Sequence, residues 1–194
     1  MNARERILAA AVRQYEEHGS RGATTRRIAE AAEVNEVTVF RHFKSKDRLL
    51  REALEWAALR TEATIPLPEE PRDPRAELTK WCDARLSAMY RARALIRTSM
   101  GEFEEHPDAT QSGTEVAMRI SNELITYLER LRARGMAGAD VDAHAATSFL
   151  MGALFSDAMG RDIMPSRYPY PLAEAGAIYT DLFLRALGVD QAEA

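Results

Sequence analysis

Residues 25–43 have the sequence TRRIAEAAEVNEVTVFRHF, which contains two short helix-forming runs separated by a turn. The first run covers residues 26–32, residues 33–34 form the turn, and Asn35 is a candidate N-cap for a second helix that ends at Phe43. A helix of about seven residues, a tight turn and a second short helix are typical of a helix-turn-helix. Taken alone, the pattern fits DNA binding and simple packing about equally well.

The apolar residues of this stretch predict a core shared with a preceding helix over residues 4–18. Val39 and Phe43 are four residues apart, so they lie on one face of the second helix. An α-helix fits the major groove, where residues at its N-terminal end contact base edges. The positions left nearer the outer face are Glu36, Val37, Thr38 and Arg41.

The composition of the 194 residues indicates an all-α protein, because 33 alanines stand against 15 valines and isoleucines together. A single cysteine, Cys82, excludes an intramolecular disulfide and a cysteine-based zinc site. The net charge of −4 divides into +2 over residues 1–55 and −6 over residues 56–194, so a polyanionic partner is expected only at the N-terminal end. The longest strongly apolar stretch is too short to span a membrane, and we expect a cytoplasmic protein without a membrane partner.

Nine helices are expected, and no strand pattern is present. Four prolines interrupt residues 65–74 and three interrupt residues 164–171, so both segments are expected to be loops. Either Asp140 or Asp142 is the expected cap of the eighth helix. The first five helices are predicted over residues 4–18, 26–32, 35–43, 46–64 and 75–91. A sixth follows directly and ends at about residue 105, and the last three are predicted over residues 114–134, about 142–161 and 172–187.

Motifs of enzymatic chemistry are absent from the sequence, which has no G-x-S-x-G, G-x-G-x-x-G or Walker-type motif. The four histidines are far apart in sequence and form no H-E-x-x-H. The nearest approach to a metal cluster is the acidic segment 102–108, which we interpret as a solvated helix end before Pro107. We therefore expect no catalytic residues, no metal and no cofactor.

The N-terminal segment resembles the tetracycline-repressor (TetR) family of transcriptional regulators over residues 4–54. The resemblance rests on the T-T pair at residues 24–25, the run I-A-E-A-A-E-V at 28–34, the ending T-V-F-R-H-F at 38–43 and S-K-D-R-L-L at 45–50. The remaining residues match the family only in helix count and layout. The resemblance implies an N-terminal helix-turn-helix DNA-binding domain over residues 1–46 and a C-terminal effector-binding and dimerisation domain over residues 47–194.

The resemblance also implies roles for individual residues of the DNA-binding domain. Thr25 matches a residue that holds a phosphate, and Arg26 a residue that reaches guanine, whose O6 and N7 accept from a guanidinium. Residues 36–38 match base-contacting positions, and Phe40 takes the place of a tyrosine that contacts phosphate. The complete set of expected DNA-binding residues is Thr25, Arg26, Glu36, Val37, Thr38, Phe40, Arg41, His42 and Lys46.

Three residues depart from the family pattern. Glu33 replaces the usual turn glycine, so the turn is expected to adopt a left-handed or bridging conformation at a cost of about 1 kcal/mol. Phe40 cannot donate the hydrogen bond that a tyrosine gives to a phosphate. Glu36 places a carboxylate near DNA, where it repels phosphates but can accept from the amino group of cytosine. We hypothesise that Glu36 selects cytosine.

The last two helices are apolar around most of their circumference, which predicts that each buries a second face. The resemblance implies that this face forms a four-helix interface with an identical chain, and the alternative is a single larger core. A two-fold dimer would bind a near-palindromic operator. The expected dimer residues are Phe149, Leu150, Leu154, Tyr179, Leu182 and Phe183.

Regulators of the resembled family hold a small-molecule effector among helices five to eight. Eight methionines indicate an adaptable apolar site, although each is individually explained by ordinary core packing. We expect Leu50, Leu54 and Trp56 of the fourth helix to connect this site to the DNA-binding domain. The candidate effector residues are Trp81, Arg85, Met89, Met100, Phe103, Met118, Asn122 and Phe155.

The sequence thus predicts a homodimeric transcriptional regulator that binds double-stranded DNA and is released by a small apolar or amphipathic effector. A repressor is the expected form. The alternatives are an activator of the same fold, and a helical ligand carrier or enzyme whose N-terminal unit is only a scaffold.

Overall fold

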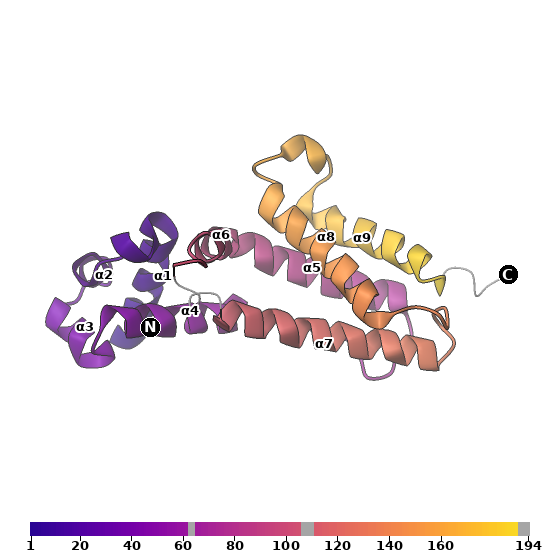
Figure 1. The fold of residues 1–194 in the computed structure, drawn as a ribbon, viewed down its shortest axis with the longest axis horizontal. Helices are drawn as coiled ribbons and strands as arrows, with labels where there is room; N and C mark the ends of the chain where they lie inside the picture. The colour runs from indigo at the N-terminus through magenta and orange to yellow at the C-terminus, as the bar shows by residue number, and fades with distance from the viewer. Residues whose placement is uncertain (62–64, 106–110, 190–194) are drawn as a thin grey trace. The chain divides into compact units, whose positions relative to one another are not determined.

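The computed structural model describes residues 1–61, 65–105 and 111–189, and these residues form nine α-helices, one short 3-10 helix and no strand (Figure 1). The chain divides into two compact units. We call Met1–Glu62 with Ala92–Val116 the head, and Ala63–Arg91 with Ala117–Ala194 the body. The all-α prediction and the helix count are confirmed for the described residues.

The head contains α1 (Ala3–Gly22), α2 (Thr25–Ala31), α3 (Glu36–Phe43), α4 (Lys46–Thr61) and α6 (Arg93–Gly101). Helix α1 packs against α2, α4 and α6, so it is the central helix of this unit. The apolar residues that were predicted to share a core with the first helix are buried in one cluster, to which α4 also contributes. Large side chains of this core are Ile7, Leu8, Tyr15, Ile28, Phe43 and Leu49.

Side-chain caps begin the first three helices of the head. Asn2 forms a capping box with Glu5 at the start of α1. Thr24 accepts from the Arg27 N–H at 3.3 Å before α2, and Asn35 accepts from the Val37 N–H at 2.8 Å before α3. Each cap satisfies a first-turn donor that has no partner within its own helix. The Asn35 cap therefore sets the start of α3, after the turn that separates it from α2.

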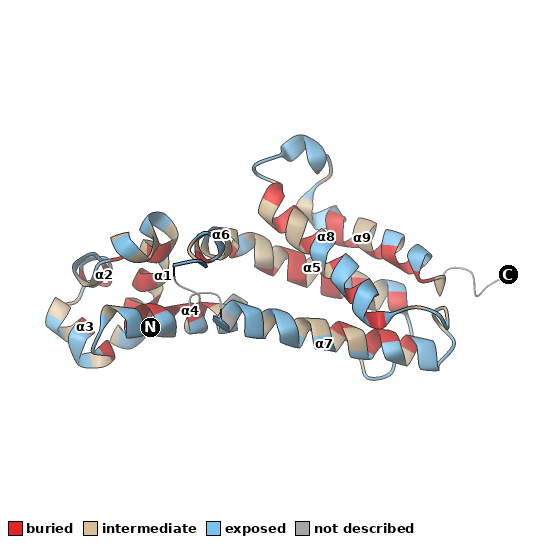
Figure 2. Cartoon of the chain, viewed as in Figure 1, coloured by how far each residue is buried: buried red, intermediate tan, exposed pale blue. Residues whose placement is uncertain are grey.

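The body contains α5 (Pro74–Arg91), most of α7 (Gln111–Ala133), α8 (Ala143–Gly160), the 3-10 helix η2 (Pro165–Arg167) and α9 (Leu172–Ala186). Helices α5, α8 and α9 pack on one another. In Figure 2, the N-terminal half of α7 is mostly exposed, and its buried residues lie in its C-terminal half. The core of the body includes Leu78, Trp81, Leu86, Leu124, Tyr127, Leu154 and Phe183.

A glycine lets α5 and α9 approach closely. A Cβ atom built on Gly176 of α9 would lie 2.0 Å from Asp83 Oδ1 and 2.9 Å from the Asp83 backbone nitrogen. Because backbone atoms cannot rotate away as a flexible side chain does, only glycine fits at this crossing. The packing of α5 against α9 therefore requires glycine at residue 176.

The predicted helix ends differ from the observed ones by a few residues. The sixth helix, expected to reach about residue 105, ends at Gly101 and continues as turns. The fourth helix is described to Thr61, and residues 62–64 of the prediction lie outside the described residues. Helix α4 shares a core with α1, so the compact units do not divide at residue 46; the functional boundary between residues 46 and 47 stays a prediction.

Among the described residues, no helix combines the length and apolarity needed to cross a bilayer.

Candidate functional site

The predicted DNA-contacting residues lie at the surface of the head, on α2, α3 and the start of α4. Val37 is 73% exposed and Phe40 is 47% exposed, although both are apolar. Val39 and Phe43, on the opposite face of α3, are buried in the head core. Helix α3 therefore divides as the periodicity predicts, with its first residues presented to solvent.

The turn between α2 and α3 is a Schellman motif with glutamate in the glycine position. Glu33 has φ 55°, in the left-handed region that L residues adopt at a cost. The Glu33 N–H donates to Glu30 O at 3.2 Å, and the Val34 N–H donates to Ala29 O at 3.0 Å. The left-handed conformation expected from the missing glycine is confirmed.

A hydrogen bond joins the first residues of α2 and α3. Thr25 Oγ1 donates to Glu36 Oε1 at 2.5 Å. A hydroxyl has one proton, so this hydrogen bond leaves Thr25 no proton for a phosphate oxygen. The sequence suggested separate roles for the two residues, and their contact depends on how α2 and α3 cross.

Arg26 and Lys46 differ in how they are held. The Arg26 side chain is exposed and pairs with Glu30 one turn later at 3.1 Å, a surface ion pair that holds it only weakly. Lys46 Nζ donates to the Ser20 carbonyl at 2.8 Å, at the C-terminal end of α1. An ammonium has three donors, so this anchor leaves Lys46 able to contact a further acceptor.

The residues that follow α6 contact the C-terminal end of α1. Glu102 Oε1 accepts from the Ser20 N–H at 2.7 Å, and Arg21 pairs with Glu105 at 2.9 Å. Gly19 has φ 64°, and a Cβ there would lie 2.5 Å from Glu102 Oε1. Ser20 therefore contacts both residues: its N–H donates to Glu102, and its carbonyl accepts from Lys46. Glu102 and Glu105 belong to the acidic segment 102–108, which was interpreted from the sequence as a solvated helix end. Residues 106–108 of that segment lie outside the described residues.

The predicted effector residues fall into both units. Met100 and Phe103 belong to the head and are exposed. In the body, Trp81 and Arg85 are buried, whereas Met118 and Asn122 are exposed on α7. The remaining two, Met89 and Phe155, are half-buried.

Trp81 and Arg85 lie one turn apart on α5, with the guanidinium 5.3 Å from the Trp81 ring centroid. Arg85 Nη2 pairs with Glu123 Oε2 of α7 at 2.9 Å, and Glu123 Oε1 accepts from the Leu67 N–H at 2.7 Å. The Arg85 charge is therefore compensated within the body. Trp81 Nε1 and Thr147 Oγ1 are buried without a hydrogen-bond partner, which costs about 1–3 kcal/mol for each group.

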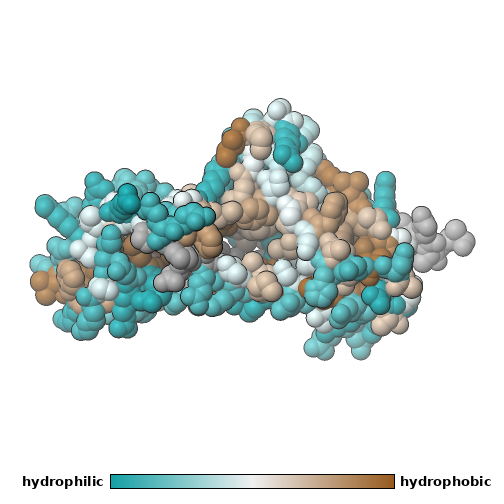
Figure 3. Space-filling model, viewed as in Figure 1, coloured by the Kyte–Doolittle hydropathy of each residue, from teal (hydrophilic) through white to brown (hydrophobic). Residues whose placement is uncertain are grey.

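The predicted dimer residues divide between the core and the surface of the body. Leu150, Leu154 and Phe183 are buried in the core of this chain, which corrects their placement on an outer face. Phe149 and Leu182 are 66% and 59% exposed, and Tyr179 is half-buried. Figure 3 shows apolar side chains gathered over α9. The second apolar face of these helices is therefore smaller than the periodicity suggested.

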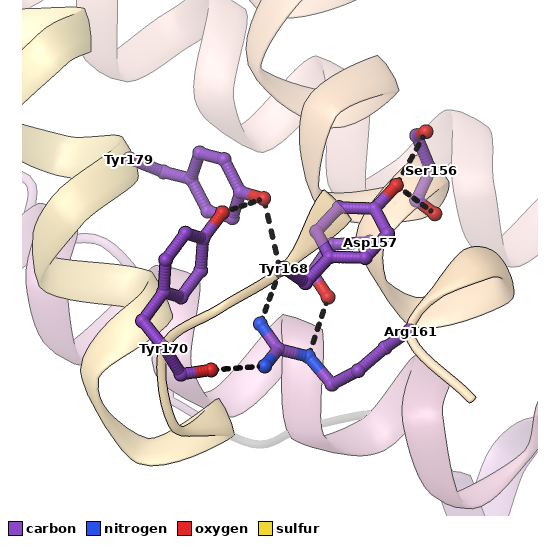
Figure 4. Close-up of polar contacts among 6 residues, drawn as sticks. All are labelled: Ser156, Asp157, Arg161, Tyr168, Tyr170 and Tyr179. Atoms are coloured by element: carbon purple, nitrogen blue, oxygen red, sulfur yellow. Dashed lines mark hydrogen bonds and ion pairs between the residues drawn. The ribbon is translucent and has the colours of Figure 1, made fainter. Parts of the chain in front are cut away.

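A buried polar network fixes the connection between α8 and α9 (Figure 4). Asp157 is fully buried and receives two hydrogen bonds of 2.7 Å from Nε and Nη2 of Arg161. The Tyr179 hydroxyl also donates to Asp157, at 2.8 Å, and contacts the Tyr170 hydroxyl at 2.8 Å. Burial, with these two hydrogen bonds, raises the pKa of Tyr179. Arg161 donates to the Tyr170 carbonyl as well, so the network holds the segment after α8 against both helices.

Sequence reasoning missed this network because Asp157 lies within an apolar helix. Its only signal was the spacing of Asp157 and Arg161, which places them one turn apart. Within the described residues, no group of histidine, cysteine, aspartate and glutamate side chains is arranged to hold a metal ion.

The N-terminal part of the head matches a known family model. Residues 7–53 match the model described as bacterial regulatory proteins, tetR family. The HTH-type transcriptional regulator YvkB of Bacillus subtilis strain 168 is 30% identical over 146 residues, which are 75% of this chain and 76% of that protein.

Solved structures share the fold of the whole chain. One, from Mesorhizobium loti MAFF303099 and assigned to the TetR family of transcriptional regulators, has a TM-score of 0.76 and 20% identity, and the match covers 97% of this chain and 96% of that chain. The transcriptional regulator FadR of Bacillus subtilis, solved in complex with stearoyl-CoA, has a TM-score of 0.70 and 19% identity, with 93% and 97% covered. At these sequence identities the similarity shows a shared fold and nothing more.

Proposed function

Because the chain belongs to the tetR family of bacterial regulatory proteins, we propose that this DNA-binding transcriptional regulator is a homodimeric repressor of a near-palindromic operator. A small apolar or amphipathic effector releases it from DNA. The observation that carries the proposal is the surface of α3, which presents Glu36, Val37 and Phe40 beside a buried opposite face. The first turn of such a helix can enter the major groove and contact base edges.

Exposed apolar residues of α8 and α9 support the homodimer. Phe149 and Leu182 are large side chains that water surrounds in the single chain, and their burial against a second copy would be favourable. A two-fold axis pairs each patch with its own copy, which gives two α3 helices and a near-palindromic operator. A charged residue at both positions should leave a folded chain that sediments as a monomer.

The unpartnered buried groups of the body support the effector. Trp81 Nε1 requires an acceptor and Thr147 Oγ1 can use either an acceptor or a donor. A ligand with an apolar body and a polar atom would bury its apolar surface and relieve one of these groups. FadR of Bacillus subtilis, which shares the fold, was solved with stearoyl-CoA, a ligand of amphipathic character. The two heads of a dimer can be held at different distances from each other. A ligand that binds more tightly to the dimer with a spacing that does not fit the operator shifts the population away from DNA.

Selection of bound duplexes from a random pool at about 0.15 M salt tests the proposal. Recovery of a near-palindromic site, with affinity that falls steeply as salt rises, is the expected result. A helical carrier or enzyme with a scaffold head would enrich no site at this salt or at a lower one, and that result would overturn the proposal. A reporter placed behind the recovered site then separates repression from activation.

A further inference from the structure

The hydrogen bond between Thr25 and Glu36 gives the DNA-contacting surface a fixed acceptor. We propose that Thr25 is a positioning residue for Glu36, and that the positioned carboxylate selects cytosine in each half-site. This inference rests on the proposed function, because it concerns which base that surface recognises. It assigns Thr25 a role different from the phosphate contact that the family resemblance implies.

The geometry favours a stable orientation of the Glu36 carboxylate. Thr25 Oγ1 lies 2.5 Å from Glu36 Oε1, within the short range of hydroxyl–carboxylate hydrogen bonds. Glu36 is the first residue of α3, where the helix dipole stabilises a negative charge. Thr24, and not Thr25, caps α2, so the Thr25 hydroxyl is not needed to begin that helix. The hydroxyl is thus available to hold one carboxylate oxygen, and the second oxygen can face a base.

A carboxylate discriminates among bases because it only accepts hydrogen bonds. In the major groove cytosine presents an amino donor, whereas guanine presents two acceptors and thymine an acceptor and a methyl group. Adenine presents a donor beside an acceptor, which repels the same carboxylate. Repulsion from phosphates weakens binding to every sequence equally, so Glu36 lowers overall affinity and increases specificity.

Removal of the Thr25 hydroxyl separates positioning from a phosphate contact. Thr25→Val keeps the shape of the side chain and removes its donor, and Thr25→Ser keeps the donor as the matched control. Each protein is used to select duplexes, and its affinity is then measured for the recovered site and for the same site with the cytosine replaced.

The wild-type protein and Thr25→Ser should prefer cytosine by about fivefold to tenfold at one position of each half-site, the discrimination of a single good base contact. Thr25→Val should lose most of this preference while it still binds the site. If Thr25→Val instead weakens binding to all variants of the site equally and keeps the cytosine preference, Thr25 contacts phosphate and the inference is wrong.

Glu36→Gln gives an independent measurement that does not depend on the folding of Thr25→Val. If Thr25 donates to the amide oxygen, the amide nitrogen faces the base and the preference should move from cytosine to a base with an acceptor edge. Unchanged preference for cytosine in Glu36→Gln would overturn the inference while leaving the proposed function intact. Failure of the wild-type protein to enrich any site would overturn both.

Discussion

Replacement of Glu33 by glycine should stabilise the head, because the turn between α2 and α3 holds a glutamate at φ 55°. An L residue in the left-handed region costs about 1–2 kcal/mol, which glycine avoids. Glycine loses more freedom on folding, at a cost of about 0.5–1 kcal/mol. The Glu33 side chain is exposed, so its removal breaks no buried packing. The net expected gain in the free energy of unfolding is about 0.5–1 kcal/mol.

Urea denaturation followed by far-UV circular dichroism measures this gain. With a slope of about 2 kcal/mol per M, the midpoint for the head should rise by about 0.3–0.5 M without a change in slope. Glu33→Ala is the matched control, because it removes the same side chain and keeps the strained backbone. A midpoint for Glu33→Ala that rises as much as that of Glu33→Gly would refute the argument, since the gain would then come from the lost charge.

Three further changes test the packing, pH dependence and polar groups of the body. Gly176→Ala should destabilise it by about 2 kcal/mol or more, because the new Cβ meets the Asp83 backbone, whereas Gly113→Ala, in open space, should be neutral or stabilising; thermal melting compares them. Burial alone would raise the pKa of Glu77, but three hydrogen bonds to its carboxylate lower it, so its contribution is present above pH 4.5 and is lost as pH falls below that value. Glu77→Gln should therefore be less stable than wild type near neutral pH by a margin that shrinks toward pH 3, and a constant margin would contradict this. Thr147→Val should stabilise the chain by about 1 kcal/mol in urea denaturation, because it removes a buried hydroxyl without a partner; a loss of stability would show that the hydroxyl is satisfied.

Local signals predicted the helices, and predicted their ends to within a few residues. Asn35 and Asp142, both named as cap candidates from the sequence, accept first-turn N–H groups, and Thr24 and Ser45 do the same. These caps depend on residues within three positions of one another, so they are visible in the sequence. Gly135, which directly follows the predicted helix over residues 114–134, has the positive φ of a helix-ending glycine.

Contacts between elements were not visible in the sequence. Thr25 and Glu36 are 11 residues apart, and Ser20 and Glu102 are 82 apart. Whether such pairs meet depends on helix crossing angles, which side-chain periodicity does not determine. The same limitation explains the dimer residues: the pattern of α8 and α9 showed two apolar faces, and only packing revealed that Leu150, Leu154 and Phe183 fill the core of this chain.

The head accommodates each of its three departures from the family pattern in a different way. The strain at Glu33 is borne by a Schellman turn whose two hydrogen bonds remain intact. The charge of Glu36 is held by the Thr25 hydroxyl. Phe40 has no such compensation, since its ring is 47% exposed and water covers apolar surface at a cost. That cost would be recovered if the ring packs against a thymine methyl group or a deoxyribose, so we expect Phe40 to make an apolar contact on DNA.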